Sequence, residues 1–120
     1  WPYCGEMDIM EQTGWNKNKV LGTFHWQDLS SDSYAQYGLE RTVNTSTTEF
    51  HLYSLEWTPD VIRIFYDNEP YVEFINTSSL PFNADFFIIL NIAMGGNLGG
   101  NIDPNFTQDI MEIDYVRVYQ

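Results

Sequence analysis

Basic residues and cysteines are scarce in this 120-residue chain. Five Lys and Arg residues stand against 17 Asp and Glu residues, which gives a formal net charge of −12. This charge disfavours a nucleic-acid partner, because phosphates would be repelled and no basic stripe is present to bind them. The single cysteine, Cys4, excludes a disulfide within the chain. Neutral polymers remain as candidate partners.

Long apolar runs are also lacking. No stretch approaches the roughly 20 apolar residues of a membrane span, and no basic region followed by an apolar stretch marks a signal peptide. We therefore expect no membrane contact. Aromatic residues, by contrast, make up 17% of the chain, and their flat apolar faces suit both core packing and sugar stacking.

Three carboxylates lie close together near the start, in Gly5-Glu6-Met7-Asp8-Ile9-Met10-Glu11. Side chains alternate along a strand, so Glu6 and Asp8 share one face and Met7 and Ile9 share the other. Glu11 is out of phase unless a β-bulge absorbs one residue, most simply Met10. The bulge brings all three acids to one face, and such closely spaced acids should titrate as a coupled set that retains a proton near neutral pH. The alternatives are a solvated strand end and a calcium-binding patch.

The segment from Trp1 to Glu11 resembles the active-site strand of family 16 glycoside hydrolases, in the longer Glu-x-Asp-x-x-Glu form of the laminarinase-like branch. The resemblance continues through Leu21–His25, Phe50–Pro59, Leu90–Asn97 and Ile113–Gln120. It implies that Glu6 is the nucleophile, that Glu11 is the acid/base and that Asp8 lies between them as a supporting carboxylate. His25 falls where that branch has a cleft histidine that contacts substrate.

Further site residues are predicted with structural alternatives beside them. Trp1 and Trp26 lie near the catalytic strand and His25, and either ring can stack on sugar or pack in the core. Asn91 interrupts an apolar run and either bonds backbone in the core or faces a sugar hydroxyl. Gln108 resembles a cleft glutamine of relatives. Asp114 corresponds to a calcium-binding acid of many relatives, with a simple exposed strand acid as the alternative.

Strand signals separated by turn residues predict an all-β fold, an antiparallel jelly-roll β-sandwich of the concanavalin-like kind. We expect one catalytic domain over residues 1–120, incomplete on its N-terminal side because the resemblance begins partway through the fold. Upstream sequence or a second copy would supply the missing strands. The expected strands are Gly5–Gln12, Val20–Gln27, Tyr34–Val43, Phe50–Thr58, Val61–Asp67, Tyr71–Phe74, Asp85–Met94 and Ile110–Tyr119.

The resemblance implies a secreted, retaining endo-β-1,3-glucanase that acts on laminarin-type β-glucan and needs no cofactor for its chemistry, with a structural calcium ion as the one metal to consider. A non-catalytic β-glucan-binding module is the alternative from another class, although both Glu6 and Glu11 are present. A transglycosylase, or a hydrolase of agarose, carrageenan or mixed-linkage glucan, is the third. The shortage of basic residues argues against sulfated polymers, because few groups are available to pair with sulfate.

Overall fold

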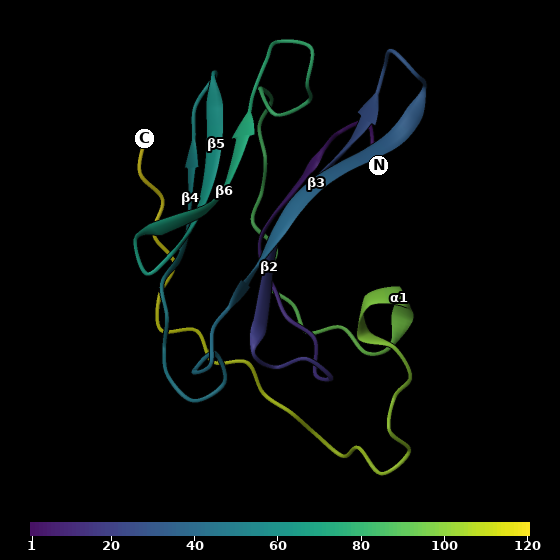
Figure 1. Ribbon diagram of the computed structural model, residues 1–120, viewed down its shortest axis with the longest axis vertical. Coiled ribbons are helices and arrows are strands. Elements are labelled where there is room, and N and C mark those ends of the chain that lie inside the picture. The colour runs from purple at the N-terminus through teal and green to yellow at the C-terminus, as the bar shows by residue number, and fades with distance from the viewer. The chain divides into compact units, whose positions relative to one another are not determined.

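The computed structural model describes residues 1–120 and contains two antiparallel three-stranded sheets (Figure 1). In the first sheet β2 lies between β1 and β3, and in the second β5 lies between β4 and β6. The strands are β1 (Glu6–Glu11), β2 (Lys19–Asp28), β3 (Ser33–Thr42), β4 (Tyr53–Trp57), β5 (Val61–Tyr66) and β6 (Glu69–Ile75). The first six predicted strands are therefore present, and the all-β class is confirmed.

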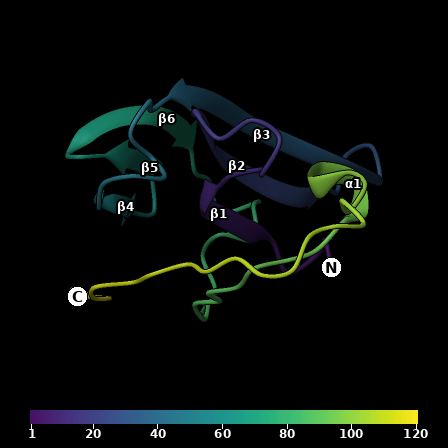
Figure 2. The ribbon, with the colours of Figure 1, turned by 90° about the horizontal axis from the view of Figure 1, so that it is seen from below.

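The two sheets bury a shared core. Its fully buried members, Phe24, Ile62, Ile64, Val72 and Phe82, come from both sheets and from the segment after β6. β3 contacts β6 and β1 contacts β4, and Figure 2 shows β3 and β6 near each other. Because one face of each sheet is committed to this core, the opposite face of the first sheet is free to carry polar side chains.

Turn chemistry sets the register of the hairpins. Asp67 and Asn68 connect β5 to β6, and both have positive φ angles, 47° and 69°. Two such residues form the mirror-image turn whose twist matches that of paired strands. Between β2 and β3, the Asp28 carboxylate accepts hydrogen bonds from the backbone N–H and the hydroxyl of Ser30. This turn fixes which residues of β3 lie opposite those of β2.

Residues 87–120 form a second compact unit, separate from the unit of residues 1–86 that holds both sheets. Its one regular element is the single helical turn α1 (Gly96–Gly99). The predicted strands at Asp85–Met94 and Ile110–Tyr119 are not formed, so this part of the prediction is wrong. An extended segment is stable as a strand only when a neighbour pairs with its backbone, and neither sheet pairs a strand with these residues.

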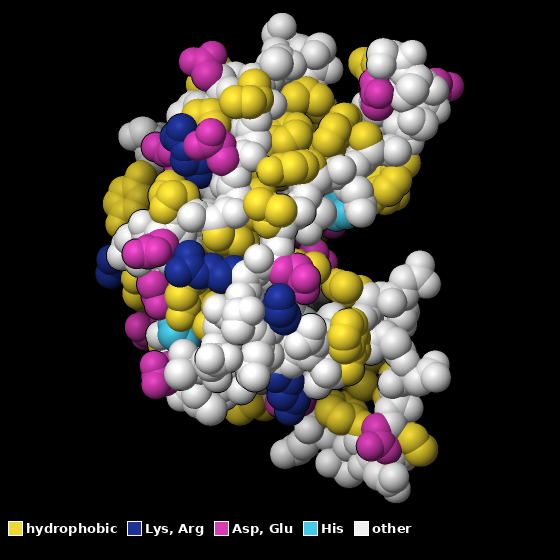
Figure 3. Space-filling model, in the orientation of Figure 1, with side chains coloured by type: hydrophobic (Ala, Val, Ile, Leu, Met, Phe, Trp, Pro, Cys, Tyr) yellow, Lys and Arg dark blue, Asp and Glu magenta, His cyan; other side chains and the backbone are white.

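Acidic side chains outnumber basic ones on the face shown in Figure 3, where hydrophobic side chains also gather in patches. Many large apolar residues of the second unit are exposed, among them Ile88, Leu90 and Val118. The apolar residues of the second unit are therefore not buried in a core of their own. The structure has no helix of the length and apolarity needed to cross a membrane.

Candidate active site

The bulge predicted in the first strand is present. Glu6 lies opposite His25 and Asp8 opposite Thr23, but Glu11 lies opposite Leu21. The chain thus takes three steps along β1, from Asp8 to Glu11, against two steps along β2. One extra residue is absorbed, which returns Glu11 to the face that carries Glu6 and Asp8. Met7 and Ile9 pack against the core on the other face, as the alternation requires.

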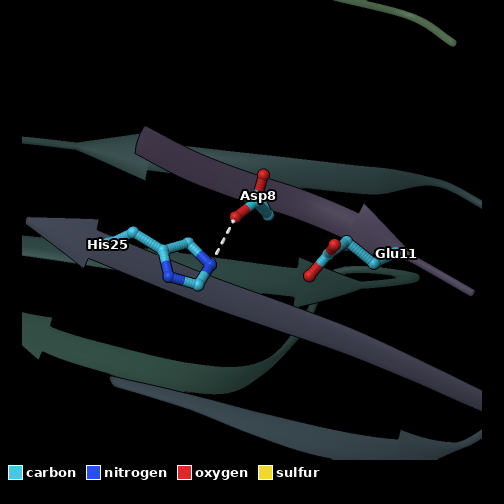
Figure 4. A group of neighbouring side chains, drawn as sticks. All are labelled: Asp8, Glu11 and His25. Atoms are coloured by element: carbon cyan, nitrogen blue, oxygen red, sulfur yellow. Dashed lines mark ion pairs between the residues drawn. The ribbon is translucent and has the colours of Figure 1, made fainter. Parts of the chain in front are cut away.

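His25 projects from β2 into the group of acids (Figure 4). Its Nε2 lies 3.1 Å from Oδ2 of Asp8, and both side chains are largely buried. The donor atoms of His25, Asp8 and Glu11 all lie within 4.8 Å of one another. Thr23, also from β2, donates its hydroxyl to Oε2 of Glu11 at 3.4 Å. The central strand of the sheet therefore supplies polar partners to the acids on its edge strand.

Asp8 has a strongly perturbed acidity. Burial raises its pKa from 3.8 to about 8, with further increases from the charges of Glu11 and Glu6 and from a hydrogen bond with Glu6. Ionising Asp8 would place a third negative charge in a space with little water, so its neutral form is favoured. Asp8 accordingly holds a proton at neutral pH and can donate it to the Glu6 carboxylate. Of the three acids, Asp8 is the one whose pKa the structure raises clearly.

Aromatic rings border the acids on one side. The indole N–H of Trp1 donates to Oε2 of Glu6. The ring of Trp1 lies 5.5 Å from that of Tyr34, which in turn stacks on the imidazole of His25 at 5.8 Å with an 18° interplanar angle. Trp1 is 69% exposed and Tyr34 is 47% exposed. These accessible ring faces beside carboxylates are the type of surface on which a sugar ring can lie.

Trp26 is not brought to this face. It follows His25 on β2, so its side chain points to the opposite side of the sheet. There its ring packs against Phe74 at 5.1 Å and Phe82 at 6.2 Å, next to the buried core. Trp26 therefore packs in the core, which was one of the two placements expected for it. The sequence signal for this placement is its position directly after His25, because neighbouring residues of a strand face opposite sides of the sheet.

Three predicted residues, Asn91, Gln108 and Asp114, belong to the second unit and are exposed there. Their roles at the site stay predictions. Calcium takes six to eight oxygen ligands, and no cluster of three or more acidic, His or Cys side chains includes Asp114. The role of Asp114 as a calcium ligand stays a prediction.

Tyr34 and Gln36 on β3 also belong to the site, although sequence analysis did not single them out. Gln36 lies opposite His25 in the register of β2 and β3. The Tyr34 hydroxyl lies 2.5 Å from Nδ1 of His25 and donates to Oε1 of Gln36 at 2.5 Å. The i, i+2 spacing of these two residues was a usable signal, because it places both on one face of a predicted strand next to the strand of His25.

This arrangement can support acid–base chemistry, since it combines a protonated carboxyl group, neighbouring carboxylates and an imidazole within reach of one another. Asp8, Glu11 and His25 also offer three oxygen or nitrogen donors with the spacing of a divalent cation site. Acidic groups commonly have such spacing without an ion. The bulge, the buried proton and the aromatic border are features that a cation site does not need.

Known proteins share both the sequence and the fold. The model of the family described as Glycosyl hydrolases family 16 matches residues 2–117. A beta-glucanase of Rhodothermus marinus is 40% identical over 131 residues, which cover all of this chain and 46% of that protein. The crystal structure of LamAcat from Zobellia galactanivorans superimposes with a TM-score of 0.84 and 46% identity, covering 89% of this chain and 43% of that one.

A LamA variant from the same organism, solved in complex with laminaritriose and laminaritetraose, gives a TM-score of 0.83 at 45% identity, again over 89% of this chain and 43% of that one. The chain belongs to glycosyl hydrolase family 16. It spans about half the length of the beta-glucanase it matches. The family resemblance seen in the first strand and in the later segments of the sequence is confirmed.

Proposed function

We propose that this chain carries the catalytic strand of a retaining endo-β-glucanase that cleaves β-1,3-glucan. The observation that carries the proposal is the bulge in β1, which puts Glu6, Asp8 and Glu11 on one face with a proton held at Asp8. Retaining glycosidases need two carboxyl groups on either side of the scissile bond, one to attack and one to donate a proton. This strand supplies both and a third between them.

In the first step Glu6 forms a bond from its carboxylate oxygen to the anomeric carbon. The glycosidic C–O bond breaks, and Glu11, which must carry the proton shared among the acids at this step, gives it to the leaving oxygen. In the second step water attacks the same carbon, Glu11 takes a proton from that water, and the Glu6 carboxylate is released. Asp8 supports the attacking carboxylate, because its neutral form donates a hydrogen bond that helps hold Glu6 in position.

The choice of β-1,3-glucan rests on two lines of support. The relatives include a beta-glucanase and a LamA variant in complex with laminaritriose and laminaritetraose. The accessible rings of Trp1 and Tyr34 offer stacking surfaces for an uncharged sugar chain, whereas five basic residues leave little to pair with sulfate groups. A polymeric substrate of this kind is too large to cross a membrane, so we also propose that the enzyme acts outside the cell.

The test is Glu6→Ala with and without azide. Removing the nucleophile should abolish hydrolysis of laminarin, and azide should partly restore turnover by attacking from the space that Glu6 vacates, giving a glycosyl azide of inverted configuration. Glu73→Ala is the matched control, because Glu73 lies on β6 of the other sheet and pairs with Arg63 at 2.6 Å. Full activity in Glu6→Ala would remove Glu6 from the mechanism.

A further inference from the structure

A directional chain of hydrogen bonds reaches His25 from the neighbouring strand. The hydroxyl of Tyr34 donates its hydrogen to Oε1 of Gln36 at 2.5 Å. A tyrosine hydroxyl has one hydrogen, so the same oxygen can only accept from Nδ1 of His25, which lies 2.5 Å away. The chain therefore requires a hydrogen on Nδ1 of His25.

This requirement sets the tautomer of the neutral imidazole. With the hydrogen on Nδ1, Nε2 carries a lone pair and acts as an acceptor. Nε2 is the nitrogen that faces the acids, 3.1 Å from Oδ2 of Asp8.

Ring packing and strand pairing hold the hydrogen-bonded residues His25, Tyr34 and Gln36 in place. The imidazole of His25 stacks on the ring of Tyr34, and Trp1 lies against both rings at 6.3 Å and 5.5 Å. Gln36 is fixed directly opposite His25 by the pairing of β2 with β3. Neither ring can turn without losing its stacking partner, so the hydrogen-bond direction is built into the sheet.

We propose that Tyr34 and Gln36 are positioning residues that hold His25 in its Nδ1–H tautomer, so that Nε2 presents a lone pair to a sugar hydroxyl bound over the acids. The biological purpose rests on the proposed glucanase function, but the tautomer itself does not. The role of the two β3 residues is indirect: they act through His25. They contribute to turnover by directing one hydrogen bond, from a substrate hydroxyl to Nε2 of His25.

The tautomer can be measured directly by nitrogen-15 NMR of the imidazole rings near pH 7.5, above the ordinary histidine pKa and below the pKa of about 8 that burial gives Asp8. The chain has only two histidines, His25 and His51, so His25→Ala assigns the spectrum. We expect Nδ1 of His25 to be the protonated nitrogen in the wild-type protein. A predominantly Nε2-protonated His25 would overturn the proposal.

Variants then test the two β3 residues. Tyr34→Phe keeps the ring but removes the hydroxyl, and Gln36→Met removes the acceptor, so each should convert the His25 signals to a mixture of tautomers. Gln36→Glu, by contrast, keeps an oxygen acceptor at this position, so His25 should stay in the Nδ1–H form. Tyr37→Phe is the matched control, because the Tyr37 ring lies 5.8 Å from Phe74 on the core side. Unchanged His25 signals in both loss variants would refute the positioning role.

Two further comparisons keep the results separable. If Tyr34→Phe also shifts the His51 signals, the fold has changed, and the exposed Gln36→Met variant decides the question. On laminarin, each loss variant should lower kcat/KM in proportion to the fraction of His25 that leaves the Nδ1–H form, about twofold for an equal mixture. Gln36→Glu, which keeps an acceptor, should retain the wild-type kcat/KM. A wild-type protein that hydrolyses no β-glucan would defeat the proposed function, while the spectra would still establish or reject the tautomer.

Discussion

Replacing Asp8 with Asn should change how stability depends on pH. In the folded protein the pKa of Asp8 is about 8, against 3.8 ordinarily, chiefly because the group is buried. Between these values the folded state retains a proton that the unfolded state has released. The contribution of Asp8 to stability is therefore fully present below its unfolded-state pKa. It decreases as pH rises and is lost completely above its folded-state pKa.

The magnitude follows from the two pKa values. Each unit of difference corresponds to about 1.4 kcal/mol for a fully buried group. Because Asp8 is partly exposed and solvent screens its charge, we expect it to lower the free energy of unfolding by about 2–3 kcal/mol between pH 4 and pH 9. Asp8→Asn carries a neutral amide at every pH and lacks this loss. We expect the variant to match the wild type near pH 4 and to be about 2–3 kcal/mol more stable near pH 9.

Urea unfolding followed by the fluorescence of the four tryptophans measures this difference. Asp28→Asn is the control, because hydrogen bonds from Ser30 lower the pKa of Asp28. Asp28 is ionised in both folded and unfolded states above pH 6, so its replacement should have the same effect at pH 6 and pH 9. Equal pH slopes for the wild type and Asp8→Asn would refute the buried proton.

Three other changes test the site and its support. Glu11→Gln should slow hydrolysis of natural glucan far more than that of a substrate with an activated aryl leaving group, which hardly needs protonation; equal losses in kcat/KM would assign Glu11 a structural role. Deleting Met10 should remove the bulge and leave the three acids in strict alternation, with part of the laminarin activity retained; a folded but inactive protein would show that the bulge itself sets the working geometry. Gly22→Ala should cost about 1–3 kcal/mol by thermal unfolding, because an added Cβ would lie 2.8 Å from Ile64, whereas Gly14→Ala, where nothing lies within 4 Å, should be neutral.

The spacing of acids within one strand was enough to predict the most important local feature of the site. Glu6, Asp8 and Glu11 share a face only if one residue is extra, and the observed register has that extra residue. The prediction succeeded because strand alternation is a property of the backbone and does not depend on distant contacts. The same rule predicted that Met7 and Ile9 pack inward.

Apolar sequence alone did not determine which segments form strands. The runs at residues 85–94 and 110–119 have strong strand character, but no strand forms there, because a strand is defined by the neighbour that accepts and donates its backbone hydrogen bonds. Propensity is a property of the segment, whereas pairing is a property of the whole sheet.

The electrostatics and the hydrogen-bond directions of the site likewise came only from tertiary structure. The sequence indicates that three closely spaced acids will share a proton, and the structure adds that partial burial and the charges of Glu11 and Glu6 raise the pKa of Asp8 most clearly. It also joins His25 to Tyr34 and Gln36, which depend on the register between two strands. Local sequence determined which groups could meet on one face, and strand pairing and burial decided which of them touch and which of them keeps the proton, because desolvation and hydrogen bonding act through space and not along the chain.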